Sequence, residues 1–138
     1  MKYTPRFLGC ILLFCAALAW SQEDQDWMLV CMTRYTVVEV KLSSMKRISK
    51  NVVQVWLREL PKADSLLQAR QFRGYDNWAY SQTLFQVNLN SEKCRSISYI
   101  DYSDKGETIS SSSDEGKWEP IIPGTVAEGI FSYLRKRR

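Results

Sequence analysis

The chain has 138 residues, of which 45% are apolar, 25% charged and 12% aromatic, and its formal net charge is +4. This composition is typical of one ordinary globular domain, and it excludes collagen, coiled coil and extensive disorder. The sequence contains no histidine. A Ser-His-Asp triad, a histidine-ligated zinc ion and a histidine pH switch are therefore excluded within this chain.

The N-terminal residues have the pattern of a secretory signal. Lys2 and Arg6 precede an apolar run over residues 7–19 that is too short to span a bilayer comfortably. Ala19 and Ser21 then place small residues where a signal peptidase reads them. We predict cleavage after Ser21, or alternatively after Ala19. An uncleaved N-terminal anchor is the other interpretation.

This prediction determines the extent and the charge of the mature protein. Residues 1–21 form the signal peptide, and residues 22–138 form a single domain that is exported to the periplasm or the outer cell surface. No later segment is long and apolar enough to cross a membrane. Loss of Lys2 and Arg6 lowers the net charge from +4 to +2, and residues 135–138 carry +4 by themselves. The remaining domain is thus slightly acidic, which argues against a nucleic-acid partner.

Cys31 and Cys94 are the two cysteines that remain after cleavage. They allow only one pairing, and in an exported protein we expect that disulfide to form. In the chain-entropy model a loop of this length gains about 4 kcal/mol of stability. The alternative is two buried free thiols, because a disulfide requires Cα atoms within about 7 Å.

The first half of the domain has the patterns of β-strands. Residues 27–32 are apolar at successive positions, as in a strand covered on both faces. Residues 35–42 alternate, as in a half-buried strand, and residues 52–60 form a further β-branched run. Beyond Pro61 the pattern is weaker, although Asp64 could cap a short helix over residues 65–70.

An aromatic segment follows, with Tyr75 in a turn at residues 74–77 and Trp78 and Tyr80 after it. These three side chains are candidates for an exposed partner-binding loop. The alternative is that Trp78 belongs to the core, which is the commoner position for a tryptophan in a small domain.

The second half is predicted to be a meander that ends in a helix. Strands are expected over residues 83–89 and 94–102, with Cys94 and Ile100 on one face, and a short polar strand over 107–112. Thr125-Val126-Ala127-Glu128 has the pattern of a capping box, and residues 126, 130 and 134 form an apolar stripe. The predicted fold is therefore α+β, with about six antiparallel strands and a C-terminal helix packed on one face.

No catalytic constellation is evident in the sequence. Asp101 and Asp104 fall at a strand end and a turn, where carboxylates commonly bind backbone groups. A glycine-rich phosphate loop is absent, and two cysteines without other soft or imidazole ligands bind metals poorly. We expect neither an enzyme nor a cofactor.

The basic segment Arg135, Lys136, Arg137 and Arg138 is a second candidate binding site. It could bind an anionic surface such as lipid headgroups or acidic polysaccharide. The alternative is a solvated end that complements the helix dipole.

The order of these landmarks resembles the bacterial surface-adhesin protein E family over nearly the whole predicted mature chain. The most specific part is the pattern Trp-x-x-Ile-x-Pro-Gly-Ser/Thr. The matching pieces are Trp27 and residues 38–44, 52–56, 81–84, 99–106 and 118–125. The resemblance implies an antiparallel sheet curled around a helix, and it implies adhesion as a function.

The chain departs from the family pattern at two positions. The family commonly has Asp-Cys where Asn88-Leu89 stands here, and it commonly ends its helix with a cysteine. Both features are missing together, which fits the loss of a mutual disulfide and its replacement by Cys31–Cys94.

We therefore expect a non-enzymatic, adhesin-like or protein-binding envelope protein, with extracellular or envelope proteins as partners and a monomeric or homodimeric state. Its binding surface would be an exposed sheet edge or the aromatic loop. The alternative is a periplasmic accessory protein that binds a small ligand between sheet and helix, for which an apolar cavity would be the sign.

Overall fold

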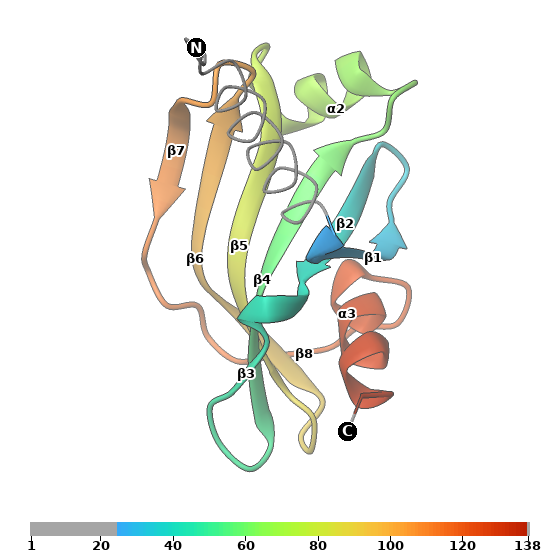
Figure 1. Cartoon of the computed structure of the whole chain (residues 1–138), viewed down its shortest axis with the longest axis vertical. Coiled ribbons are helices and arrows are strands. Elements are labelled where there is room, and N and C mark those ends of the chain that lie inside the picture. The colour runs from blue at the N-terminus through green and yellow to red at the C-terminus, as the bar shows by residue number, and fades with distance from the viewer. Residues whose placement is uncertain (1–24, 138) are drawn as a thin grey trace, which may run out of the picture.

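The structure, a computed structural model, describes residues 25–137 and contains one antiparallel sheet and two α-helices (Figure 1). The predicted signal peptide (residues 1–21) and Arg138 lie outside the described residues. The strands are β1 (Trp27–Met32), β2 (Thr36–Lys41), β3 (Lys46–Arg47), β4 (Val52–Pro61), β5 (Trp78–Asn88), β6 (Lys93–Ser103), β7 (Thr108–Ser112) and β8 (Glu119–Pro120). The helices are the 3₁₀ turn η1 (Leu42–Ser44), α2 (Leu66–Arg73) and α3 (Val126–Arg135).

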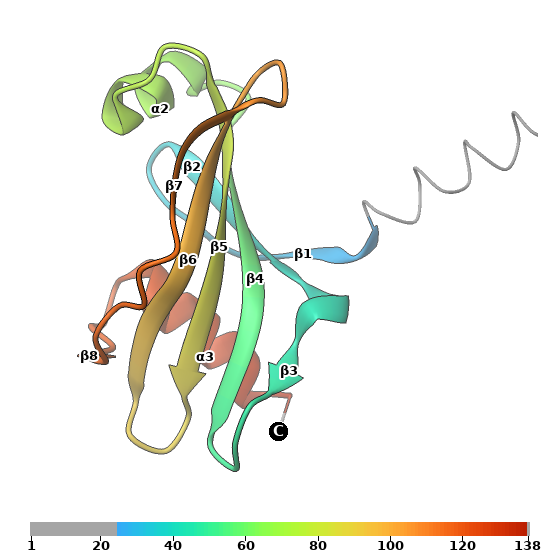
Figure 2. The same cartoon turned by 90° about the vertical axis from the view of Figure 1, so that its left-hand side faces the viewer.

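The eight strands form a single sheet in the order β1-β2-β4-β5-β6-β7, with β3 paired to β4 and β8 paired to β6. The prediction of a mostly antiparallel sheet with a C-terminal helix is confirmed. The six strands of the main path match the predicted number, and the two-residue strands β3 and β8 are additions that the sequence pattern did not indicate. Figure 2 shows that β4, β5 and β6 are long and bend along their length.

One face of the sheet, here called the inner face, carries the apolar half of each alternating strand. On β2 and β4 every second residue is buried, which follows from the period of two in an extended chain. Helix α3 contributes to the same buried cluster as the strands. The cluster comprises Val40, Val53, Val55, Leu57, Val87, Leu89, Ile130, Phe131 and Leu134.

The opposite, outer face carries polar and aromatic side chains. Arg58 forms an ion pair of 2.7 Å with Glu39 on the neighbouring strand, and its guanidinium lies over the Trp27 ring. Gln86 bridges Gln54 and Arg95 by hydrogen bonds in the same way across β4, β5 and β6. These contacts connect neighbouring strands on the face where the apolar core is absent.

Strand β1 differs from its prediction. It was expected to be covered on both faces, but it is an edge strand that pairs only with β2. Leu29 and Met32 are 50% and 64% exposed. The apolar run of β1 thus supplies surface as well as core.

Strand β5 begins at Trp78, five residues before its predicted start. The pairing of β5 with β6 shifts register between Trp78 and Tyr80 and again between Leu84 and Phe85. Such irregularities break the alternation from which strands are recognised in a sequence. The second shift also places Cys94 on the inner face and Ile100, opposite Gln82, on the outer face, so their predicted common face is wrong.

The ends of the helices follow local chemistry. Thr125 Oγ1 accepts a hydrogen bond of 3.4 Å from the Glu128 amide, as the capping box predicts. The Glu128 carboxylate reaches one residue further than expected and accepts from the Gly124 amide at 2.7 Å. Helix α2 begins after Ser65 without a side-chain cap, since Asp64 accepts from the Ser65 hydroxyl instead of from the helix backbone.

Cys31 and Cys94 are free thiols in the structure, so the predicted disulfide is absent from it. Following the register from Cys31 across β2, β4 and β5 leads to Asp101 on β6, and Cys94 lies seven residues from that position. Different residues of α3 lie next to the two cysteines. Gly129 contacts Cys31, whereas Ala127 and Ile130 line a depression together with Cys94. A disulfide needs a much closer approach.

Candidate functional site: a groove between the sheet and α3

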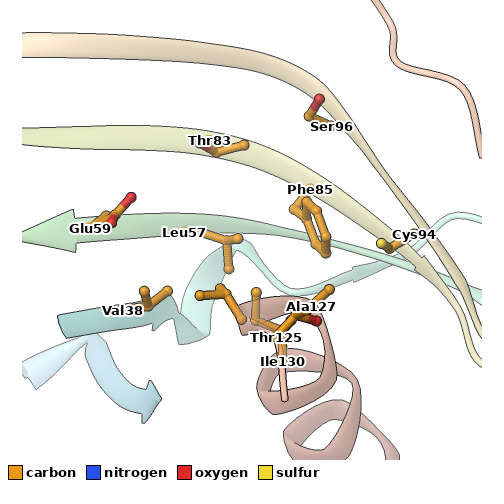
Figure 3. Close-up of a pocket in the computed structure, with 11 residues that line it drawn as sticks. Val38, Leu57, Glu59, Thr83, Phe85, Cys94, Ser96, Thr125, Ala127 and Ile130 are labelled. Atoms are coloured by element: carbon orange, nitrogen blue, oxygen red, sulfur yellow. The ribbon is translucent and has the colours of Figure 1, made fainter. Parts of the chain in front are cut away.

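An open groove of about 320 Å³ lies between the inner face of the sheet and the first turn of α3 (Figure 3). This volume is within the range of ligand pockets in proteins. The lining side chains come from β2, β4, β5, β6 and the start of α3, and the close-up shows them around the space between the sheet and the helix. The groove is lined by Val38, Leu57, Glu59, Thr83, Phe85, Cys94, Ser96, Thr125, Val126, Ala127 and Ile130.

The sheet register brings the wall residues together. Val38 pairs with Glu59 across β2 and β4, and Leu57 pairs with Thr83 across β4 and β5. Phe85 lies two residues beyond Thr83 and therefore points to the same face. The capping box begins α3 at Val126, so the first helical turn closes the groove on the side away from the sheet.

Glu59 is the only charged residue that lines the groove, and its charge is compensated. Thr36 Oγ1 donates to the Glu59 carboxylate at 2.7 Å, and Arg73 of α2 forms an ion pair with the same side chain. Because a paired carboxylate does not attract a further cation strongly, the groove is suited to apolar groups.

The Cys94 thiol, which also lines the groove, is uncharged as well. Burial raises the pKa of Cys94, and the nearby Glu119 carboxylate raises it further. The side chain is therefore a thiol at neutral pH and behaves as a small apolar group with low nucleophilicity.

Two further depressions of about 300 Å³ adjoin the groove and share residues with it. One shares Thr125 and Val126 and extends under the β1–β2 turn, and the other shares Glu59 and extends toward α2. Their rims carry the most exposed large apolar side chains of this region, Met32 at 64% and Phe72 at 76%. Together the three depressions form a concave surface with exposed apolar side chains at its rim, and Arg34 lines both adjoining depressions.

The predicted aromatic loop is not a binding surface built from three exposed rings. Trp78 is fully buried, its indole nitrogen donates to Ser81 at 3.0 Å, and the Arg73 guanidinium lies 5.2 Å from its ring centre. Tyr80 is half-buried and stacks on Tyr102 with ring centres 4.6 Å apart. The structure therefore confirms the interpretation in which Trp78 belongs to the core.

The remaining candidate residues are separated from these. Tyr75 is half-buried in the turn before β5, where its carbonyl accepts from the Trp78 amide at 3.2 Å. Arg135, Lys136 and Arg137 are exposed at the C-terminal end of α3, opposite the end that borders the groove. The structure therefore does not unite the two sets of predicted binding residues.

Sequence reasoning named Cys94 as a disulfide partner, and it named none of the other groove residues as a site. The groove is assembled from strands that are distant in the sequence, and its walls depend on the shifted register of β5 and β6. Two signals did point toward it. The capping box located the start of α3, and the alternation of Phe85, Val87 and Leu89 predicted a common face.

The described residues contain neither a metal-binding cluster nor a membrane-spanning helix. Between residues 25 and 137 no cluster of three or more histidine, cysteine, aspartate or glutamate side chains is arranged to hold a metal ion. Within the same range, neither helix has the length and apolar character needed to span a membrane.

A curled antiparallel sheet with a C-terminal helix, and an open groove between them, defines a protein of the α+β class. The family model for surface-adhesin protein E matches residues 27–134, and the chain belongs to this family. No curated protein and no solved structure shows a significant match to the chain. The resemblance predicted from the sequence is thereby confirmed, and the family indicates a surface adhesin.

Proposed function

We propose that this chain is a non-enzymatic surface adhesin that is exported and that binds an extracellular or envelope protein through the groove. The observation that carries the proposal is the family match over residues 27–134. Residues 1–21 act as the signal peptide in this proposal, and residues 22–138 form the one binding domain, as a monomer or a homodimer.

An apolar hollow between sheet and helix is also the sign expected for a small-ligand protein, but the groove is open and the family match indicates an adhesin, so we choose an apolar protein segment as the bound group. Its lining is mainly apolar, its one carboxylate is paired, and Met32 and Phe72 are exposed at the rims of the adjoining depressions. Exposed apolar side chains around a concave floor are typical of protein-binding surfaces. In this proposal helix α3 remains packed on the inner face of the sheet and forms one rigid wall of the groove.

The experiment fills the groove and measures binding. Ala127→Trp and Thr83→Phe each add an aromatic ring to a lining position, and Ser132→Trp adds the same bulk at an exposed position of α3. Binding of the purified full chain to immobilised extracellular-matrix proteins and plasminogen is then compared by biolayer interferometry. Urea unfolding of each variant shows which of them keep the fold.

We expect wild-type and Ser132→Trp proteins to bind at least one of these proteins with similar affinity. The two filled variants should bind it about tenfold or more weakly, since one buried apolar side chain contributes about 1.5–3 kcal/mol. Binding that is retained by both folded, filled variants would locate the surface elsewhere. Absence of binding by the wild type to every probe would contradict the adhesin proposal itself.

Export has its own test. Fractionation of the expressing cells and mass spectrometry of the product should find the protein in the envelope or the medium, with an N-terminus at Gln22 or at Trp20. A cytosolic protein that retains Lys2 and Arg6 would contradict this part of the proposal.

A further inference from the structure

The lower end of the molecule gathers basic side chains from two segments that are far apart in the sequence. The β3–β4 hairpin supplies three of them, and the end of α3 and the residues after it supply the other three (Figures 1 and 2). We call this set the basic pole, and all of its members are exposed. It consists of Lys46, Arg47, Lys50, Arg135, Lys136 and Arg137.

The two segments meet in one small depression. Arg47 from the hairpin and Arg137 from the helix end line a hollow of about 200 Å³ together. The other side chains around the hollow are apolar. They are Met45, Val53, Leu89 and Leu134. A site with two guanidinium groups at its wall and an apolar floor is suited to an anion that carries hydrocarbon.

Most of this positive charge is not neutralised by the protein. The one ion pair recorded for the pole within residues 25–137 joins Arg135 to Glu92 at 3.9 Å, at the surface, where such pairs contribute little. Arg47 donates to the Lys50 carbonyl at 2.7 Å, which orients its side chain without removing its charge. Arg137 lies over the Tyr133 ring at 4.7 Å.

An apolar side chain projects among these cations. Ile48 follows Arg47 at the start of the turn that ends β3, and it is 47% exposed. Its amide is bonded to the Val52 carbonyl at 2.9 Å, so the hairpin holds it in a fixed position. Apolar side chains that enter the headgroup region, surrounded by lysine and arginine, are the pattern of a peripheral membrane contact.

We propose that the basic pole docks this domain on a membrane that contains anionic phospholipid. The cations bind the phosphate-bearing surface, the hollow between Arg47 and Arg137 receives a headgroup, and Ile48 inserts between headgroups. The apolar floor and Ile48 favour a lipid over an acidic polysaccharide, which offers no hydrocarbon. The groove borders the opposite end of α3, so a docked molecule presents the groove away from the membrane.

This inference goes beyond the proposed adhesin function and does not depend on it. The test is co-sedimentation of residues 22–138, the proposed mature protein, with vesicles of phosphatidylglycerol and phosphatidylcholine, compared with vesicles of phosphatidylcholine alone. Lys46→Gln/Lys50→Gln removes two exposed cations of the pole. The matched control is Lys62→Gln/Lys105→Gln, which makes the same charge change outside the pole.

We expect binding that requires phosphatidylglycerol and weakens with added salt. The pole variant should bind about 25-fold more weakly, since each lysine near an anionic surface contributes about fivefold, and the control should change less than twofold. Equal losses in the two variants would show that net charge alone acts and would overturn the proposal. Vesicle binding that is absent in the wild type would overturn it as well.

Two more variants separate a lipid from other polyanions. Ile48→Ser should weaken vesicle binding but leave any binding to dextran sulfate unchanged. Arg47→Gln should reduce the preference for phosphatidylglycerol over oleate-doped vesicles of matched surface potential, because the hollow recognises phosphate. If dextran sulfate binds as tightly as the vesicles and Ile48→Ser has no effect on either, the pole is a general polyanion site and the lipid assignment fails.

Discussion

The indole nitrogen of Trp78 donates a hydrogen bond of 3.0 Å to Ser81 Oγ, which itself donates to the carboxylate of Asp101 on the neighbouring strand. All three residues are buried. The chain Trp78–Ser81–Asp101 thus satisfies polar groups that would otherwise be costly to bury. It also fixes the wide ring at the point where the register of β5 and β6 shifts.

We therefore predict that Ser81→Ala destabilises the protein by about 1–3 kcal/mol, because the indole N–H and one carboxylate oxygen lose their buried partner. Trp78→Ala should cost about 3–5 kcal/mol through the cavity it leaves. Urea unfolding measures both changes. Ser111→Ala on the exposed side of β7 is the control and should stay near zero. A small effect of Trp78→Ala would contradict its assignment to the core.

Gly129 lies where α3 closely approaches β1. A Cβ atom at this position would lie 2.9 Å from the Cys31 Cβ and 3.3 Å from its sulfur. We predict that Gly129→Ala destabilises the fold by about 1–3 kcal/mol, because overpacking outweighs the better helix propensity of alanine. The double variant Cys31→Gly/Gly129→Ala removes the clashing atom and should recover part of the loss. If urea unfolding showed Gly129→Ala to be more stable than the wild type, the predicted overpacking would be wrong, because β1 would have moved away from the added methyl group at little cost.

Cys31 and Cys94 should remain unlinked in the folded protein. Burial raises the pKa of both thiols, so we expect slow alkylation in the native state and rapid alkylation of both after unfolding. Mass spectrometry of protein isolated without reductant measures this. Cys94→Ser should also leave the alkylation rate of Cys31 unchanged. A disulfide-linked peptide pair would instead show that the sheet can close far enough to join them.

Asp26 provides a pH-dependent link between the start of β1 and η1. Its carboxylate accepts hydrogen bonds from the hydroxyl and the amide of Ser43, and these bonds lower the pKa of Asp26 below its ordinary value of 3.8. A lowered pKa means that the link stabilises the folded state above pH 3.8 and is lost as the pH falls through the folded-state pKa.

The measurement is an NMR titration of the Asp26 carboxyl carbon. Ser43→Ala should move the midpoint upward toward 3.8, because the largest stabilising hydrogen bond is removed. Ser91→Ala, in an exposed turn, is the control and should leave the midpoint unchanged. A midpoint that does not respond to Ser43→Ala would contradict the assigned cause.

Much of the architecture was determined by the sequence itself, because it depends on local chemistry. Alternation predicted β2, a β-branched run predicted β4, and Thr125 with Glu128 predicted where α3 begins. The pattern around residues 118–125 indicated the family that the match over residues 27–134 confirms. Each of these signals lies within a few consecutive residues, so no knowledge of the fold is needed to detect it.

Tertiary structure alone decided what these elements do together. The bulges between β5 and β6 set which face Trp78, Cys94 and Ile100 take, and no local pattern encodes a pairing partner. The distance between Cys31 and Cys94 depends on five strands and a helix. The groove and the basic pole likewise join residues from distant segments, because burial of one apolar face forces the sheet and α3 together.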